Sequence, residues 1–213
     1  MIDKKTALYS EWINQGFLLP EEYIDKKIIH KTILYMNKTI SQSEIDIHNW
    51  HIRSKSILRL CRDQKILRYL KVILGKDINI WRSVLFLKPS QSKNSSIPWH
   101  QDNALWELTP HLTASVWLAL DDVYENNGCI ELIPGTHLYR YAHNKKIGIK
   151  FNHQVNKLNP NLLQNAVKIT RKKGQFLIFN ENILHRSMAN KSLTRRAALC
   201  FRYTIPSVKI INR

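Results

Sequence analysis

The chain has 213 residues, 44% of them hydrophobic, so it is long enough to bury a core without disulfides or structural metals. Its 33 Lys and Arg against 16 Asp and Glu give a formal net charge of +17. These basic residues are spread from Lys4 to Arg213, which is weak evidence for a patch that binds nucleic acid or a membrane.

Cysteine usage and hydropathy indicate a cytoplasmic protein. Cys61, Cys129 and Cys200 are odd in number and lack CxxC spacing, which argues against a disulfide framework or a zinc ribbon and fits a reducing compartment. The first residues have no apolar signal region, and no apolar run is long enough to span a membrane. We therefore expect no membrane contact.

Residues 1–75 are expected to be mostly helical and to belong to the same single domain, 1–213, as the rest of the chain. A capping Asp3 and a terminal Gly16 predict a first helix. Pro20 followed by two acidic residues predicts the start of a second helix that reaches about residue 36. Apolar residues with helical period over 57–73 are expected to be core positions.

Residues 76–213 are expected to form a β core. Short β-branched and aromatic runs between turn residues predict strands over 78–87, 97–102, 113–120, 129–133, 166–170, 175–180, 183–188 and 195–205. This spacing favours a sandwich or barrel of the jelly-roll, cupin-like kind, so the expected fold class is mainly β with flanking α-helices. The polar connection 139–165 has the length of a lid or binding loop.

His100 and Asp102 form a candidate metal-ligand pair at the end of one predicted strand. Side chains at positions i and i+2 of a strand point the same way, so both can reach one point in space. His185, which follows an apolar strand and a turn, is the best candidate for a third ligand. Two His and one carboxylate with open positions is the ligand set of non-haem Fe(II) oxygenases.

Arg196 begins a predicted strand whose alternate residues include Arg202. A buried Arg on an inward face needs an anionic partner, and the guanidinium fork suits a carboxylate. We expect Arg202, on the same face, to contact an anionic part of the substrate or a metal-ligand carboxylate.

Several further segments form a recognisable set: Trp99-His100-Gln101-Asp102, the run 115–122 around Trp117, Asn126-Asn127-Gly128-Cys129, Ile133-Pro134-Gly135-Thr136-His137, Gly174-Gln175-Phe176, His185-x-Ser187-x-x-Asn190 and Arg196. Together they resemble the phytanoyl-CoA dioxygenase family of Fe(II)/2-oxoglutarate oxygenases. The run 15–20 resembles the family's N-terminal strand. The segments cover nearly the whole chain in the family's order, although the chain is short for the family.

The resemblance implies a double-stranded β-helix core with His100, Asp102 and His185 as iron ligands. It makes Arg196 the partner of the distal carboxylate of 2-oxoglutarate. The implied cofactors are Fe(II), 2-oxoglutarate and O2, and the implied reaction oxidises a substrate with release of succinate and CO2. Related halogenases replace the ligand carboxylate with Ala or Gly, so Asp102 favours hydroxylation, or another oxidation such as desaturation or ring closure.

Other site residues follow from the resemblance with alternatives left open. Trp117 is expected beside the cofactor, with plain core packing as the alternative. Ser187 is expected to contact the cofactor and Asn190 to lie near the substrate, with strand-edge hydrogen bonding as the alternative for both. Gln101 should point away from the ligands, and His137 should be a structural turn residue. His111, His143 and His153 are expected in loops.

Two competing functions use the same residues. Arg196 and Arg202 also match the Arg-x5-Arg spacing of nucleic-acid alkylation-repair oxygenases, for which the net charge would be a phosphate footprint. The second competing function is a non-catalytic cupin-like binding module. The complete set of His100, Asp102 and His185 argues against it. The family's substrates include acyl-CoAs, amino acids and natural-product intermediates. The basic residues of 139–165 favour an anionic or carrier-tethered small molecule, and nucleic acid is the less favoured partner.

Overall fold

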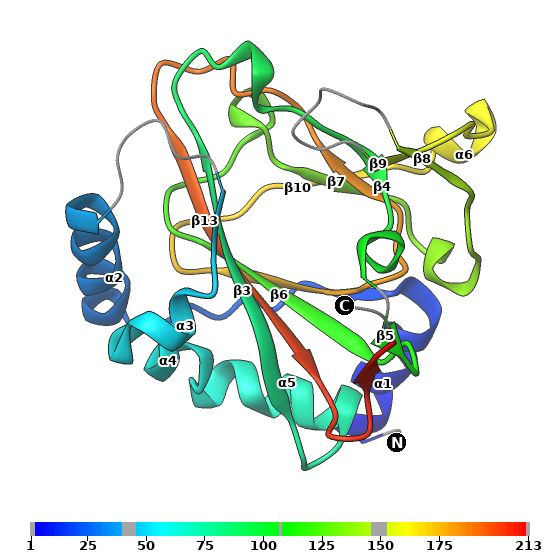
Figure 1. The fold of residues 1–213 in the computed structure, drawn as a ribbon, viewed down its shortest axis with the longest axis horizontal. Coiled ribbons are helices and arrows are strands. Elements are labelled where there is room, and N and C mark those ends of the chain that lie inside the picture. The colour runs from blue at the N-terminus through cyan, green and yellow to red at the C-terminus, as the bar shows by residue number, and fades with distance from the viewer. Residues whose placement is uncertain (1–2, 40–45, 107, 146–152, 212–213) are drawn as a thin grey trace.

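Two antiparallel sheets face each other, and helices cover the outer face of the larger one (Figure 1). The computed structural model describes residues 3–39, 46–106, 108–145 and 153–211. This is the jelly-roll arrangement that the sequence predicted. No helix within these ranges is long and apolar enough to cross a membrane.

The larger sheet has the strand order β1-β11-β6-β13-β3-β2. Its strands are β1 (Phe17–Leu18), β2 (Asp46–His48), β3 (Asn79–Lys88), β6 (Thr113–Ala119), β11 (Phe176–Asn180) and β13 (Arg196–Thr204). Along β13, Ala197, Leu199 and Phe201 face the helices, whereas Ala198 and Cys200 face the smaller sheet. The period of two therefore turns Arg196 and Arg202 inward as well, as the sequence predicted.

The smaller sheet has the order β10-β7-β12-β4, and it supplies the other wall of the inner core. Its strands are β4 (Ile97–His100), β7 (Ile130–Leu132), β10 (Val167–Ile169) and β12 (His185–Ser187). Two strand pairs lie outside the sheets: β5 (Leu108–Thr109) with β14 (Lys209–Ile210), and β8 (His143–Lys145) with β9 (His153–Val155). The register pairs His185 with His100, so the sheet itself brings two predicted ligands side by side.

The helical layer is built by five helices in the first part of the chain. They are α1 (Lys4–Gln15), α2 (Lys26–Thr39), α3 (Trp50–Arg53), α4 (Lys55–Cys61) and α5 (Gln64–Leu74). Asp3 caps α1 and Gly16 ends it in a left-handed conformation, as predicted. The fully buried Ile66 and Leu70 of α5 belong to the same apolar core as the helix-facing side of β13.

The predicted start of the second helix at Pro20 is wrong. The helix begins at Lys26, and Asp25 accepts hydrogen bonds from the backbone N–H groups of Lys27 and Ile28, as a capping residue does. Tertiary contacts hold the preceding segment extended, because Ile24 N–H donates to the carbonyl of Gly174. The pattern over 57–73 is also divided between α4 and α5.

The predicted strand 97–102 is shorter in the structure, and Asp102 lies beyond its end. The strand β4 ends at His100, and Asp102 is the first residue of the 3₁₀ helix η2 (Asp102–Leu105). The backbone of Gln101 stays extended, with φ −110° and ψ 134°. The i and i+2 side chains therefore still point to the same side, for the reason given at the sequence level.

The connection 139–165 contains more structure than predicted. It includes β8, β9 and the helix α6 (Pro160–Leu163), and residues 146–152 lie outside the described ranges. The prediction that His143 and His153 lie in loops is therefore wrong, whereas His111 does lie in a loop. The remaining 3₁₀ helices are η1 (Lys93–Ser95), η3 (Glu125–Asn127) and η4 (Thr136–Leu138).

Candidate metal centre

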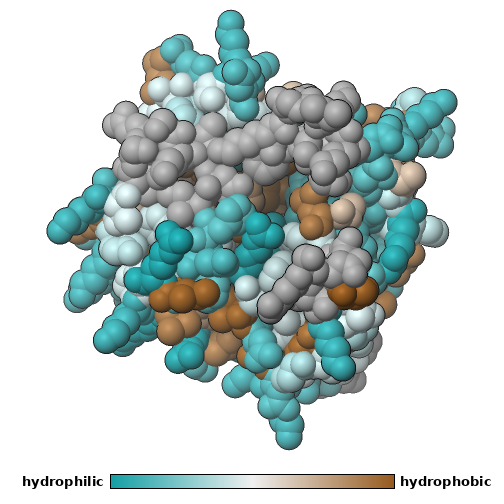
Figure 2. Space-filling view, in the orientation of Figure 1, coloured by the Kyte–Doolittle hydropathy of each residue, from teal (hydrophilic) through white to brown (hydrophobic). Residues whose placement is uncertain are grey.

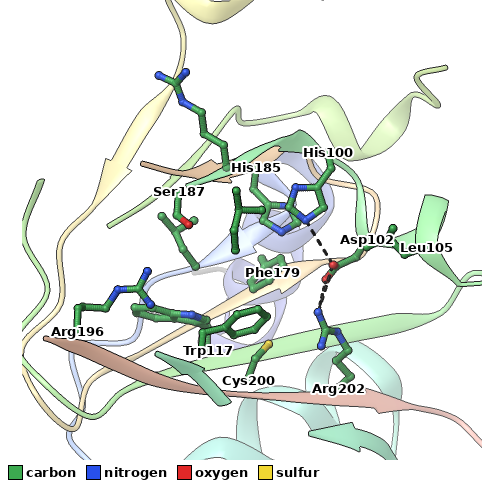
Figure 3. Close-up of a pocket in the computed structure, with 14 residues that line it drawn as sticks. His100, Asp102, Leu105, Trp117, Phe179, His185, Ser187, Arg196, Cys200 and Arg202 are labelled. Carbon is green, nitrogen blue, oxygen red and sulfur yellow. Dashed lines mark hydrogen bonds and ion pairs between the residues drawn. The ribbon is translucent and has the colours of Figure 1, made fainter. Parts of the chain in front are cut away.

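His100, Asp102 and His185 converge at the edge of a cavity between the two sheets (Figure 3). All three side chains are buried, and their ligating atoms lie within 4.8 Å of one another. Nε2 of His100 is 3.8 Å from Oδ1 of Asp102, and the two imidazole rings are 4.2 Å apart between centroids. Two imidazoles and one carboxylate on one side of a point is the donor set of an iron site with open positions.

Backbone carbonyls fix the orientation of both imidazoles. Nδ1 of His100 is 2.8 Å from the carbonyl oxygen of Pro98, and Nδ1 of His185 is 3.0 Å from that of Ile183. A proton on each Nδ1 leaves each Nε2 as the free lone pair that a metal needs. Burial lowers the pKa of His185, and burial together with His185 lowers the pKa of His100 to about 3. Both imidazoles are thus neutral at pH 7, the form that binds metals.

Arg202 keeps the third ligand anionic. Its Nη2 donates to both carboxylate oxygens of Asp102, at 3.2 and 3.3 Å, and its guanidinium lies 4.5 Å from the Trp106 ring centre. Burial alone would raise the pKa of Asp102, but the charge of Arg202 and its hydrogen bond to the carboxylate lower it below its ordinary value. Arg202 was expected to contact either an anionic part of the substrate or a metal-ligand carboxylate. The structure shows the contact with the candidate ligand Asp102.

Arg196 lies at the other end of the same cavity, with 2% of its surface exposed. Nη2 donates to the carbonyl of Gly128 at 2.8 Å, and the guanidinium lies 5.4 Å from the centre of the Trp117 ring. Among the described residues, its buried Nε and Nη1 find no hydrogen-bond partner. Burial lowers the pKa of Arg196 to about 10, so it remains a cation at pH 7.

A second basic side chain, Lys88, lies beside Arg196. Lys88, opposite Arg196 in the β3–β13 register, is 2% exposed and donates to the backbone carbonyls of Ser187 and Met188. Burial and the charge of Arg196 lower the pKa of Lys88 to about 6. Among the described residues, no carboxylate forms an ion pair with either side chain. A buried guanidinium with two orphaned donors fits a carboxylate ligand.

Apolar and aromatic side chains form most of the wall between the two ends. Trp117 and Ser187 line the cavity, and their contact with a cofactor stays a prediction. The sequence reading did not identify Phe86, Ile97, Leu105, Ile130, Phe179, Arg186 and Cys200, which also line it. Strand alternation could have found Cys200, which lies on the same face of β13 as Arg196 and Arg202. The others are separated along the chain and give no local signal.

Asn190 and His137 lie outside the cavity lining. The side-chain amide of Asn190 donates to the carbonyls of Lys88, Pro89 and Thr194, so it fixes the connection before β13. Nε2 of His137, in η4, is 2.9 Å from the carbonyl oxygen of Ile13. His137 thus has the structural contact expected of it.

A family model described as phytanoyl-CoA dioxygenase (PhyH) matches residues 37–198. The chain belongs to the phytanoyl-CoA dioxygenase family. This confirms the resemblance to a family of Fe(II)- and 2-oxoglutarate-dependent oxygenases. The donors described above fit both cofactors of that class, because the His–Asp–His face suits Fe(II) and the orphaned guanidinium suits a carboxylate.

Individual relatives show how far the similarity extends. The peroxisomal phytanoyl-CoA dioxygenase of Rattus norvegicus is 27% identical over 168 residues, which cover 75% of this chain and 49% of the relative. A probable alpha-ketoglutarate-dependent hypophosphite dioxygenase of Stutzerimonas stutzeri is 27% identical over 164 residues, or 74% of this chain and 56% of the relative. The chain thus spans about half the length of these curated PhyH-type relatives.

Solved structures confirm the predicted fold class. The epimerase SnoN, solved in complex with Fe3+, alpha ketoglutarate and nogalamycin RO, matches with a TM-score of 0.81 over 97% of this chain and 85% of that chain. At 15% identity this likeness concerns the fold alone.

Proposed function

We propose that this chain binds Fe(II) through His100, Asp102 and His185 and 2-oxoglutarate through Arg196, and hydroxylates a small-molecule substrate with release of succinate and CO2. One observation carries the proposal: a buried His–Asp–His face and a buried guanidinium with orphaned donors lie at opposite ends of one cavity. A candidate metal-binding group and a candidate carboxylate-binding group that share one cavity support the proposal.

The residues have distinct tasks in this proposal. Fe(II) and 2-oxoglutarate, when bound, supply the activation of O2 that side chains cannot provide. Neutral imidazoles of His100 and His185 and the carboxylate of Asp102 bind the metal on one face and leave other positions accessible. Arg196 binds and orients the distal carboxylate of the co-substrate, and Trp117 and its apolar neighbours exclude water from the cavity.

Several finer points are part of the proposal. The presence of Asp102 supports hydroxylation over halogenation, and an anionic or carrier-tethered small molecule is the proposed substrate class. The three cysteines are free and buried, which supports a reducing, cytoplasmic location.

Anaerobic addition of Fe(II) and 2-oxoglutarate tests the proposal. We expect a weak visible charge-transfer band in the wild type and none in His100→Ala or Asp102→Ala. Arg196→Met should still bind Fe(II), but its Kd for 2-oxoglutarate should rise roughly 10- to 100-fold, because a charge-assisted hydrogen bond contributes about 1.5–3 kcal/mol. His137→Ala is the control, since His137 lies outside the cavity lining. A wild type without a band and without succinate formation contradicts the proposal.

A further inference from the structure

The peptide between two proposed iron ligands is held from outside the cavity. The backbone N–H of Gln101 donates to Nε2 of His143 at 3.0 Å, although the two residues are 42 positions apart. Nδ1 of His143 is 2.8 Å from the carbonyl oxygen of Tyr141. Because Nδ1 must carry the proton to donate there, Nε2 is the acceptor, and the imidazole is the neutral tautomer. His143 therefore fixes the backbone that separates His100 from Asp102.

The side chain of Gln101 also binds residues 139–141, which lie just before His143 in the chain. It is 1% exposed. Nε2 donates to the carbonyls of Tyr139, at 2.8 Å, and of Asn182, while Oε1 accepts from the N–H of Tyr141 at 3.0 Å. Both N–H donors and the carbonyl oxygen of the amide are thus used. Asn182 lies in the turn before β12, the strand that begins with His185, so this side chain connects both ligand-bearing elements to residues 139–141.

Apolar packing joins the same elements independently of these hydrogen bonds. Tyr141 and Trp99 pack against a small buried cluster that contains Leu184 and Val155. Trp99 precedes one proposed ligand and Leu184 precedes another, and Val155 belongs to β9, which lies against β4. A displacement of the segment would therefore disturb the immediate neighbours of both imidazole ligands.

We propose that His143 and Gln101 are positioning residues that couple the segment 139–145 to the iron ligands. The extended backbone of Gln101 sets the angle between His100 and Asp102, and a rotation there would separate their side chains. The ligand set is complete only while the segment is docked on β4. This inference rests on the iron site proposed above, and it concerns the chain's own residues, which hold the site without touching the metal.

Three variants test the coupling. His143→Phe keeps a flat ring but removes the acceptor, whereas His143→Gln keeps an oxygen that can accept the Gln101 N–H. Asn144→Ala is the matched control on the same strand, because Asn144 is exposed. Amide hydrogen exchange at Gln101 is measured in the metal-free proteins, and the Kd for Co(II), a redox-stable probe, is measured by absorption titration.

In His143→Phe we expect faster exchange at Gln101 and a Kd for Co(II) raised about 10- to 100-fold, the usual effect of losing a residue that orients metal ligands. The metal-free melting temperature should change by only a few degrees, about what a 1 kcal/mol hydrogen bond contributes. His143→Gln and Asn144→Ala should resemble the wild type. Wild-type exchange and Co(II) affinity in His143→Phe would overturn the coupling but not the iron site. A wild type that binds no metal would overturn the iron site itself.

Discussion

Among single residues, Glu181 has an environment that opposes its charge. It lies in the turn before His185 and is 1% exposed. Its Oε1 accepts from the N–H of Thr113 at 3.3 Å, and its Oε2 is buried without a partner among the described residues. Burial raises the pKa of Glu181 to about 7 from an ordinary value of 4.5. The folded chain thus binds a proton that the unfolded chain releases between those two values.

This shift predicts a pH dependence of stability with a definite sign. From pH 4.5 to 7 the folded state binds more protons at Glu181 than the unfolded state does, so the free energy of unfolding falls as pH rises. The loss should reach about 3 kcal/mol and stay constant above pH 7. Glu181→Gln keeps the oxygen near Thr113 and removes the ionisation. Urea denaturation of the metal-free proteins should show equal stability near pH 4.5 and a more stable variant at pH 8. Parallel pH profiles would contradict this.

At the scale of elements, the end of η3 lies between strands of the two sheets and contacts Arg196 at one end of the cavity. Gly128 ends η3 with φ +83°, and its carbonyl accepts from Arg196. A Cβ on Gly128 would lie 2.3 Å from the carbonyl oxygen of Met188, a contact that requires the backbone to move. Gly135 also has a positive φ, +75°, but the nearest atom to its Cβ would be 3.7 Å away.

These two glycines form a matched pair for mutation. Gly135→Ala should cost about 1–2 kcal/mol of unfolding free energy, the strain of a left-handed Ala. Gly128→Ala adds the backbone clash, so it should cost clearly more and should also raise the Kd for 2-oxoglutarate, because the carbonyl that anchors Arg196 shifts. Chemical denaturation and co-substrate titration measure the two effects. Equal losses of stability in both variants would show that the Met188 contact relaxes without cost.

At the scale of the whole molecule, the basic residues are spread along the chain from Lys4 to Arg213. Hydrophilic side chains surround the face shown in Figure 2 and are interrupted by apolar patches. Some cations are already paired, such as Lys168 with Glu125 and Lys172 with Asp122. Of the two arginines in the Arg-x5-Arg spacing, Arg202 is engaged with Asp102. These observations favour a small-molecule substrate over a nucleic acid.

This distribution predicts weak and unspecific binding to nucleic acid. Filter binding with single-stranded and duplex oligonucleotides across a salt series should give no saturable binding at physiological salt, and excess oligonucleotide should leave succinate formation unchanged. Phosphate contacts in a dedicated groove would instead give saturable binding whose affinity falls steeply with salt. That outcome would favour the nucleic-acid alternative.

The sequence predicted those features that depend on local pattern. Alternation along a strand was enough to place Arg196 and Arg202 inward, and the extended Gln101 brings His100 and Asp102 to one side even though the strand ends before Asp102. The predicted caps of the first helix, Asp3 and Gly16, are also confirmed, because capping depends on the few residues at each helix end.

Contacts between distant segments were not predictable. The sequence near Pro20 does not indicate that Gly174 holds this segment extended. The sequence around His143 and Gln101 likewise does not predict the hydrogen bond between them. Lys88 appears in the sequence as an ordinary strand-end lysine, although it is buried beside Arg196. Such pairings arise from the register of strands that are far apart in the chain, and single-sequence periodicity does not encode register.

The buried cation Arg196, which has no carboxylate partner among the described residues, has a practical consequence for ligand discovery. A folded state with an unpaired buried cation is stabilised by any small anion that binds it, by an amount that grows with the logarithm of the anion's concentration over its Kd. Phosphate or sulfate in a buffer would thus raise the melting temperature of the metal-free protein and conceal the shift caused by a true co-substrate. Thermal-shift screens of this chain should use large organic buffer ions, with phosphate included as a reference ligand and not as the medium.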